Sequence, residues 1–294
     1  MTAASKPTPA ASPRRSDFLF ESLVRVAGFS AIAFVLLIFL FLLREGVPAF
    51  FEVPLGNLFG TRWYPTFDLY GALPLILGSL LVTVTAIVIA LPLGVATAVF
   101  VREVAPNWAR EILKPLIEVL AGIPSVVLGF FGMTVLAPGI RTGLGMPTGL
   151  TAFTGAVLLA YMALPTIISV AEDALDAVPK SYRDASLAMG ATHWQTIWRV
   201  LLPAARSGIV ASIILGMGRA IGETMAMIMI LGNAAQMPHS ILNSARTLTT
   251  NIGIEMGYAT GDHRQALFAT GVVLFFIIMG LNSLALIFSR KGRA

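Results

Sequence analysis

The chain has 294 residues, of which 56% are hydrophobic and 12% are charged, and its formal net charge is +5. Soluble domains typically devote about a quarter of their residues to charge, so this composition indicates an integral membrane protein. The sequence has no cysteine, which excludes disulfides and thiolate metal sites, and its three histidines are scattered. Metal chemistry is therefore not expected.

Six stretches are long and apolar enough to cross a bilayer, which requires roughly 20 residues each. They lie near residues 22–43, 72–100, 111–136, 151–172, 204–232 and 265–289. The sequence therefore predicts an all-α polytopic membrane protein with six transmembrane helices. The first stretch is expected to remain as an anchor, because no small-residue cleavage site with a secreted soluble domain follows it.

Three regions are expected along the chain. Residues 1–20 are polar, basic and rich in proline, which predicts a disordered cytoplasmic tail. Residues 21–69 contain the first predicted span and an outer loop, and residues 70–290 contain the other spans. Residues 233–264 are polar, and the sequence leaves open whether they form an external loop or a re-entrant segment.

The distribution of basic residues predicts the orientation, because cytoplasmic loops are enriched in Lys and Arg. With the N-terminus inside, fourteen basic residues fall in cytoplasmic segments and five in outer loops, while Arg219 lies within a span. The even number of spans then places both termini in the cytoplasm. The same orientation makes the polar segment 180–203 cytoplasmic.

The segment 180–203 has the spacing of a helix–turn–helix elbow. Helix-compatible runs over 181–189 and 192–200 flank Gly190, which tolerates a left-handed turn, and Pro203 suits the first turn of the next helix. Small residues in the first run allow close approach by another protein, which favours docking over an ordinary amphipathic surface loop. The residues expected to form this docking elbow are Asp184, Ala185, Ser186, Gly190, Val200, Leu202 and Pro203.

Arg219 and Glu223 are the only charges deep inside a predicted span. Each costs about 2.5–3.5 kcal/mol at the bilayer centre, and on a continuous helix they lie one turn apart on one face. Arg binds phosphate or carboxylate groups bidentately, which favours an oxyanion pathway over a purely structural ion pair. Further polar candidates, each of them individually more typical of a helix-to-helix hydrogen bond, are Ser125, Thr224, Thr166 and Ser169.

Glycine and proline occur inside the second to fifth predicted spans, with Gly94, Pro124 and Gly216 among them. Small residues let membrane helices approach closely, and proline bends are tolerated where neighbours satisfy the freed carbonyls. Most of these positions are expected to serve packing and bending. The remainder would line a pathway whose helices bend or slide.

Several motifs are absent from the sequence. The chain has no Gly-x4-Gly-Lys-Ser/Thr phosphate loop, so any ATP-driven work requires a separate subunit. It has no His-Glu-x-x-His or Gly-x-Ser-x-Gly signature, which argues against an intramembrane protease or lipase. A channel or scaffold protein stays open, although neither requires a docking elbow.

The elbow residues resemble the EAA loop of bacterial ABC importer permeases, with Asp184 in place of the usual Glu and Ser186 in place of the second Ala. The stretches 71–74, 120–127, 163–168, 218–225 and 246–252 resemble the phosphate-specific transport permeases, closer to the PstC type than to its PstA partner. The resemblance covers about residues 70–290.

This resemblance implies a MetI-like permease fold in the bacterial inner membrane and phosphate import by alternating access. It implies a PstA-type permease as the heterodimer partner, two PstB-type ATPase subunits that bind ATP and Mg, and a PstS-type periplasmic phosphate-binding protein, with no cofactor in this chain and no nucleic-acid partner. Carried over by position, Arg219 and Glu223 would be the functional intramembrane charges and residues 184–203 the coupling helices. A molybdate or sulfate permease is the nearest alternative.

Overall fold

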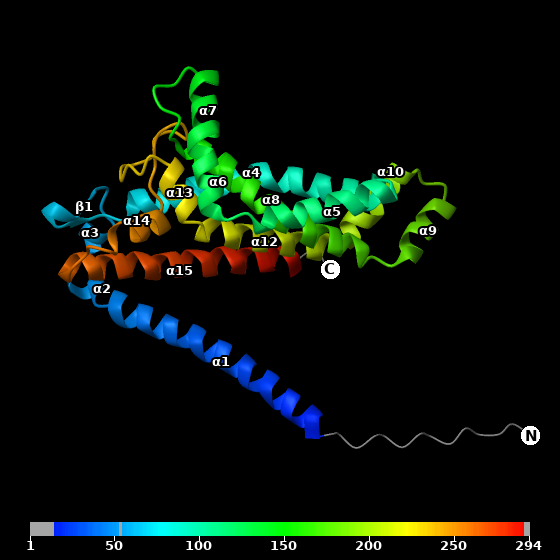
Figure 1. The fold of residues 1–294 in the computed structure, drawn as a ribbon, viewed down its shortest axis with the longest axis horizontal. Helices are drawn as coiled ribbons and strands as arrows, with labels where there is room; N and C mark the ends of the chain where they lie inside the picture. The colour runs from blue at the N-terminus through cyan, green and yellow to red at the C-terminus, as the bar shows by residue number, and fades with distance from the viewer. Residues whose placement is uncertain (1–14, 53–54, 291–294) are drawn as a thin grey trace, which may run out of the picture.

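The computed structural model describes residues 15–52 and 55–290, and these are mostly helical (Figure 1). The first part of the chain comprises α1 (Arg15–Gly46), α2 (Ala49–Glu52), α3 (Leu55–Leu58), β1 (Trp63–Tyr64), the short 3-10 helix η1 (Pro65–Phe67) and β2 (Leu69–Tyr70). The central part comprises α4 (Leu73–Val99), the π-helical turn η2 (Phe100–Val104), α5 (Asn107–Gly122), α6 (Ser125–Phe131), the π-helical turn η3 (Gly132–Leu136), α7 (Ala137–Gly143) and α8 (Ala152–Asp176). The last part comprises α9 (Lys180–Ala188), α10 (His193–Thr196), the π-helical turn η4 (Ile197–Leu201), α11 (Leu202–Ala204), α12 (Arg206–Gly222), α13 (Met225–Ile230), α14 (Leu248–Glu255) and α15 (Gly261–Arg290).

Five helices are long and apolar enough to cross a membrane, or six if the pair His193–Ala204 and Arg206–Gly222, bent by 69°, forms one span. The helices α4, α8, α12 and α15 run side by side along the long axis of the molecule (Figure 1). One end of this bundle carries α9 and α10, and the other carries α2, α3 and the β1–β2 hairpin. The predicted all-α polytopic fold is therefore confirmed, with a single short hairpin added within the described residues.

The prediction of a third span over 111–136 is wrong. The amphipathic helix α5 ends at Gly122, and the apolar span runs from Ser125 to Gly143. Pro124 causes the break, because proline has no N–H to donate and restricts the preceding residue to extended conformations. Ile123 accordingly has φ −66° and ψ 128°. The charges of α5 thus lie outside the span.

The fifth predicted span, 204–232, is also divided. The helix α12 ends at Gly222, Glu223 is extended with φ −69° and ψ 125°, and α13 begins two residues later. The expectation that Arg219 and Glu223 lie one turn apart on one continuous helix face is therefore wrong. Side chains replace the lost helical hydrogen bonds: Glu223 Oε1 accepts from the N–H of Ala226 over 3.1 Å, and Thr249 Oγ1 donates to the Glu223 carbonyl over 3.1 Å.

The central core forms where α4, α8 and α12 meet, and Ile167 of α8 lies at its middle. Ile167 is fully buried. A Cβ atom on Gly94 of α4 would lie 2.6 Å from its side chain, and a Cβ on Gly216 of α12 would lie 2.7 Å from it. Glycine at both positions therefore lets the three helices approach closely, as expected for membrane helices.

The two ends of the chain differ from the sequence-based boundaries. The helix α1 starts at Arg15, so residues 15–20 of the predicted disordered tail are helical, while residues 1–14 lie outside the described residues. An ion pair between Glu21 and Arg25, four residues apart, supports this helical start. At the outer end, residues 248–255 form α14, which packs against α4, α13 and α15 and is therefore not part of a free external loop.

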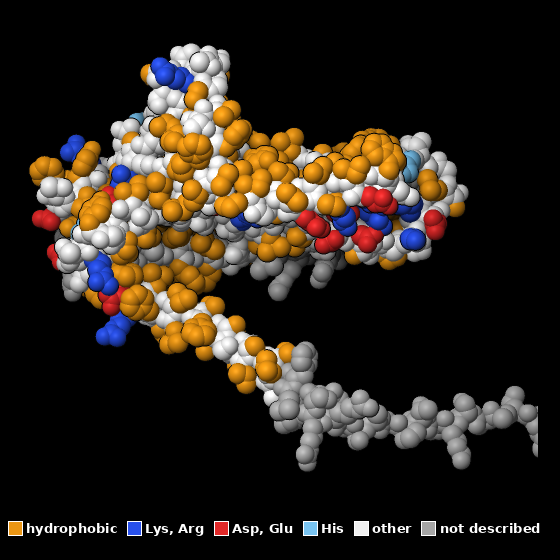
Figure 2. Space-filling model, viewed as in Figure 1, with side chains coloured by type: hydrophobic (Ala, Val, Ile, Leu, Met, Phe, Trp, Pro, Cys, Tyr) orange, Lys and Arg blue, Asp and Glu red, His pale blue; other side chains and the backbone are white. Residues whose placement is uncertain are grey.

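Charged side chains gather toward the two ends of the bundle, and apolar side chains cover the surface between them (Figure 2). Large apolar residues of the long helices, such as Val88 of α4 and Val119 of α5, are more than half exposed. An apolar belt between charged ends is the surface that a lipid bilayer requires.

Candidate functional site

Arg219 lies in the last turn of α12, immediately before the break at Glu223. Its Nη2 donates to the carbonyl oxygen of Ala121 over 3.3 Å, and its Nη1 donates to Thr166 Oγ1 over 3.5 Å. Ala121 belongs to the last turn of α5, so the guanidinium lies at the carbonyl ends of two helices. Helix C-termini favour cations, which stabilises this charge without a carboxylate.

Among the residues that the structure describes, no carboxylate lies within 4.0 Å of the Arg219 guanidinium. Neutral acceptors therefore hold the positive charge, and no carboxylate in the described part of the chain neutralises it. A half-buried guanidinium in this state attracts an oxyanion, because its planar N–H groups match phosphate and carboxylate oxygens.

The remaining predicted pathway residues have structural contacts at the two breaks. Glu223 caps the N-terminus of α13, and Thr224 Oγ1 donates to the Gly222 carbonyl over 3.2 Å. Ser125 is half-buried at the first position of α6, directly after the α5–α6 break. The structure thus places Arg219, Ser125 and the cap residues at helix breaks, but it forms no ion pair between Arg219 and Glu223.

Small residues surround Arg219 on a face that the described chain leaves open. A Cβ atom on Gly122, Gly218 or Gly222 would meet no atom within 4 Å. Gly218 and Gly222 flank Arg219 on α12, and Gly122 follows the carbonyl that binds its guanidinium. An ion or a second protein can therefore approach Arg219 from this side.

The docking elbow predicted from sequence has the expected geometry. Two helical segments, α9 and α10 with η4, flank Gly190, whose φ of +83° confirms the left-handed turn. Thr192 and Gln195 form a reciprocal cap at the start of α10. Ser186 Oγ and Thr196 Oγ1 lie 2.9 Å apart and join the two arms.

A shallow groove runs along the elbow, and its wall contains three of the residues predicted for docking, Ala185, Ser186 and Val200. Large apolar side chains are exposed beside it: Met189 is 88% exposed, and Trp194 and Trp198 are each 58% exposed. Exposed aromatic and methionine side chains at the charged end of a membrane protein are typical of a protein contact. Leu202 and Pro203 lie in the short helix α11, which joins the elbow to α12.

An ion pair connects the elbow to the second membrane span. Arg183 of α9 binds Glu103 of η2, and the Glu103 side chain is fully buried. Two further pairs lie close by in the fold, Arg102 with Asp176 and Lys114 with Glu172 over 3.1 Å. The Arg183 pair fixes α9 against η2, which follows α4, and the other two pairs join η2 and α5 to α8. None of the three was predicted from the sequence.

Replacing Gly190 with Val is expected to abolish coupling to an ATPase while the protein still inserts into the membrane. A β-branched residue is strongly disfavoured at φ +83°, and even an ordinary side chain in this region costs roughly 1–2 kcal/mol. Substrate-stimulated ATP hydrolysis of the reconstituted complex is the measurement. Gly190→Asn is the matched control, because Asn tolerates this conformation and should retain most coupling; equal activity of the two variants would contradict this account.

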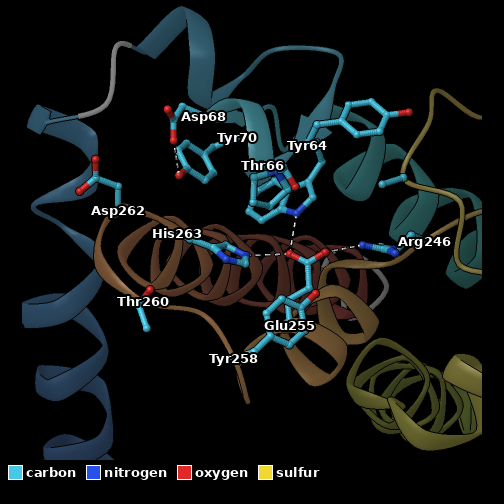
Figure 3. Close-up of a pocket in the computed structure, with 13 residues that line it drawn as sticks. Tyr64, Thr66, Asp68, Tyr70, Arg246, Glu255, Tyr258, Thr260, Asp262 and His263 are labelled. Carbon is cyan, nitrogen blue, oxygen red and sulfur yellow. Dashed lines mark hydrogen bonds and ion pairs between the residues drawn. The ribbon is translucent and has the colours of Figure 1, made fainter.

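A second polar cluster, which sequence analysis missed, lies at the outer end (Figure 3). The buried carboxylate of Glu255 accepts from Arg246 Nη1 over 2.7 Å and from Trp63 Nε1 over 2.8 Å, and His263 Nε2 lies 2.9 Å from it. These residues come from the β-hairpin, the outer segment, α14 and α15, and Trp63 and Glu255 are 192 positions apart. No local motif links them, so only the fold brings them together.

A bundle with broken helices, a guanidinium held by neutral acceptors at one break and an exposed elbow is typical of a transport subunit of the membrane. The chain belongs to the family described as the binding-protein-dependent transport system inner membrane component, whose model matches residues 90–293. A channel or scaffold outside this family is thereby excluded.

Curated relatives cover most of the chain. It is 45% identical over 225 residues to the probable ABC transporter permease protein YqgH of Bacillus subtilis, covering 75% of this chain and 73% of that protein. It is 32% identical to the phosphate transport system permease protein PstC of Xylella fastidiosa, covering 92% of this chain and 90% of that protein. It is 36% identical to PstC of Haemophilus influenzae, covering 79% of each chain.

Solved structures show the same fold at lower identity. The chain matches a structure of the inward-facing MetNI methionine ABC transporter with a TM-score of 0.62 and 21% identity, covering 79% of this chain and 99% of that one. It matches a bacterial alginate ABC transporter with a TM-score of 0.62 and 15% identity, covering 95% and 98%. The expected MetI-like permease fold is therefore confirmed.

Proposed function

We propose that this chain is the PstC-type permease subunit of an ATP-driven importer that moves inorganic phosphate from a periplasmic binding protein to the cytoplasm. The observation that carries the proposal is Arg219, an intramembrane guanidinium held by neutral acceptors at two helix ends. The phosphate permeases among the relatives support the choice of substrate.

Arg219 would bind the anion transiently during alternating access. Its contacts to Ala121 and Thr166 are 3.3 and 3.5 Å long, so an anion can replace them at small cost. Because Arg219, Ser125 and Glu223 lie beside helix breaks, a change in bend angle alters the surroundings of the bound anion. An anion that binds at one bend angle and dissociates at another is transported, provided that the two conformations differ in their affinity for that anion.

The partners follow from the two surfaces that this chain leaves open. The elbow groove with Ala185 and Ser186 would dock one PstB-type ATPase of a pair, which supplies ATP and Mg. The open glycine face around Arg219 would meet a PstA-type permease, so that the pathway lies between the two permeases. A PstS-type binding protein would deliver phosphate at the opposite end from the elbow.

The anion dependence of ATP hydrolysis tests the substrate. In the assembled complex with its binding protein, phosphate is expected to stimulate ATP hydrolysis at least about tenfold more than sulfate or molybdate. This preference corresponds to a free-energy difference of about 1.4 kcal/mol between the anions. The measurement is the initial hydrolysis rate in proteoliposomes at equal anion concentrations. A larger stimulation by sulfate or molybdate would assign the permease to that oxyanion instead.

Both termini are proposed to face the cytoplasm of a bacterial inner-membrane protein. Single cysteines can be introduced without background, because the sequence has none. A cysteine at Ser5 is expected to resist an impermeant thiol reagent added to spheroplasts, whereas one at the exposed Thr66 of the outer hairpin should react. Labelling of both positions only after lysis, or of Ser5 before it, would contradict the proposed orientation.

A further inference from the structure

A cavity of about 660 Å³ opens at the outer end of the molecule, between the β1–β2 hairpin, the end of α14 and the start of α15 (Figure 3). This volume lies within the range of pockets that hold small ligands or long side chains, roughly 300–1,000 Å³. The cavity lies at the end of the bundle that carries the hairpin, and Arg219 is not among its wall residues. Its functionally important wall residues are Tyr64, Asp68, Tyr70, Tyr258 and Asp262.

Two carboxylates on this wall have no cationic partner. Asp68 and Asp262 are exposed, and no basic side chain lies within 4.0 Å of either among the residues that the structure describes. The third carboxylate, Glu255, is different, because Arg246 binds it and neutralises it. The cavity therefore carries excess negative charge.

The charges of Asp68 and Asp262 act on the same point of the cavity. Burial raises the pKa of the Tyr70 hydroxyl, and the negative charge of Asp68, its hydrogen bond with Tyr70 over 3.3 Å and the charge of Asp262 raise this pKa further. Both carboxylates thus act on the Tyr70 hydroxyl. A cation placed there is attracted by both.

The rim adds aromatic surface to this negative charge. Tyr64 is 54% exposed and Tyr258 is 64% exposed, and both line the opening. Aromatic faces attract lysine and arginine side chains, and they do so alongside the carboxylates here. The same combination repels a phosphate anion, so the cavity is not suited to the transported substrate.

We propose that this cavity receives a lysine or arginine side chain of the soluble binding protein when that protein docks on the outer face. The occupant is chosen from three observations: the chain belongs to a binding-protein-dependent family, the cavity lies opposite the ATPase elbow, and its charge is complementary to a basic side chain. The inference rests on the proposed function only in placing the binding protein at this end.

The test measures the affinity of the cognate binding protein for the assembled transporter in lipid nanodiscs. The double variant Asp68→Asn with Asp262→Asn is expected to bind about tenfold more weakly at 50 mM salt, and the difference should largely vanish at 1 M salt, where the Debye length is about 3 Å. Asn preserves the left-handed backbone of Asp68, which has φ 52°. Elution of the intact complex on size-exclusion chromatography shows that each variant is assembled.

Matched controls separate the cavity from general outer charge. Glu45→Gln removes one negative charge near the outer end of α1, outside the cavity, and should leave the affinity unchanged. Tyr258→Phe keeps the ring and should bind as the parent does, whereas Tyr258→Leu should bind about threefold more weakly. One Lys→Glu or Arg→Glu variant of the binding protein should lose affinity for the parent transporter and recover it with Asp262→Lys.

Two outcomes would overturn the inference. If the double Asn variant and the parent transporter bind the binding protein with equal affinity at low salt, no basic side chain docks against Asp68 and Asp262. Asp68- and Asp262-dependent binding of spermidine or Mg²⁺, with unchanged affinity for the binding protein, assigns the cavity to a small cation instead. Phosphate stimulation of ATP hydrolysis is measured in the same parent complex, so that failure of the phosphate assignment is seen separately from failure of docking.

Discussion

Phosphate uptake is expected to fall about 100-fold when Arg219 is replaced by Gln, while the complex still assembles. The guanidinium is the intramembrane cation at the α12 break, and hydrogen bonds that involve a charged group contribute roughly 1.5–3 kcal/mol, or about 10- to 150-fold. Gln still offers an N–H to the Ala121 carbonyl and removes no carboxylate partner, so folding should tolerate it. Uptake of labelled phosphate into proteoliposomes is the measurement.

Glu223→Gln is the matched control for this experiment. It changes one charge at the same helix break, but the Gln carbonyl oxygen can still accept from the Ala226 N–H. Its uptake should therefore stay within a few-fold of the parent, and the double variant Arg219→Gln with Glu223→Gln should remain as defective as Arg219→Gln alone. Recovery of uptake in the double variant would show that the Arg219 charge matters only in relation to the Glu223 charge, and it would contradict an anion-binding role for Arg219.

The second large effect is expected at the ion pair between the elbow and the second span. Arg183→Gln leaves the fully buried Glu103 carboxylate without a cation, and breaking such a pair costs roughly 3–5 kcal/mol. We expect a loss of stability at the lower end of this range, because the Arg183 side chain is 35% exposed to solvent. We expect α9 to lose its fixed position and substrate-stimulated ATP hydrolysis to be uncoupled from uptake, measured as the ratio of ATP hydrolysed to phosphate transported.

A double replacement separates charge from position at this pair. Arg183→Gln with Glu103→Gln removes both charges and should recover much of the stability lost in Arg183→Gln. Asp176→Asn is the surface control, because Asp176 is 60% exposed and its pair with Arg102 is worth about 1 kcal/mol or less. If Asp176→Asn uncoupled transport as strongly as Arg183→Gln, the special role of the buried pair would be lost.

The elbow could be predicted because its signals are local. Gly190 had to turn left-handed between two helix-compatible runs, and the structure gives it φ +83°. Spacing within about twenty residues was enough to locate the two arms and three of the residues that line the groove, Ala185, Ser186 and Val200. The contact between Ser186 and Thr196 follows from the same short turn.

The helix breaks and the outer cluster could not be placed in this way. Hydropathy averages over about twenty residues, so it joined α5 to α6 and α12 to α13 across Pro124 and Glu223. Pro124 was visible in the sequence, but whether a proline bends or ends a helix depends on which side chains bind the backbone carbonyls that lose their helical hydrogen bonds. At Glu223 the side chain that satisfies the carbonyl is Thr249 of α14, and the three partners of Glu255 come from three other segments. Both arrangements therefore depend on tertiary packing.

The two breaks are mechanically linked through Gly129. A Cβ atom on Gly129 of α6 would lie 2.7 Å from Cα of Ala226 in α13, so the two short helices that follow the breaks are in backbone contact. Because protein interiors are closely packed, neither helix can move toward the other without displacing it. Beyond Pro124 the chain continues as one apolar helix from Ser125 to Gly143. Arg219 lies in the last turn of α12, just before Glu223, and α7 is the end of the apolar helix that is remote from Pro124. Any rotation of α6 about Pro124 must therefore be accommodated by α13, so the bend beside Arg219 and the position of α7 are under one steric constraint.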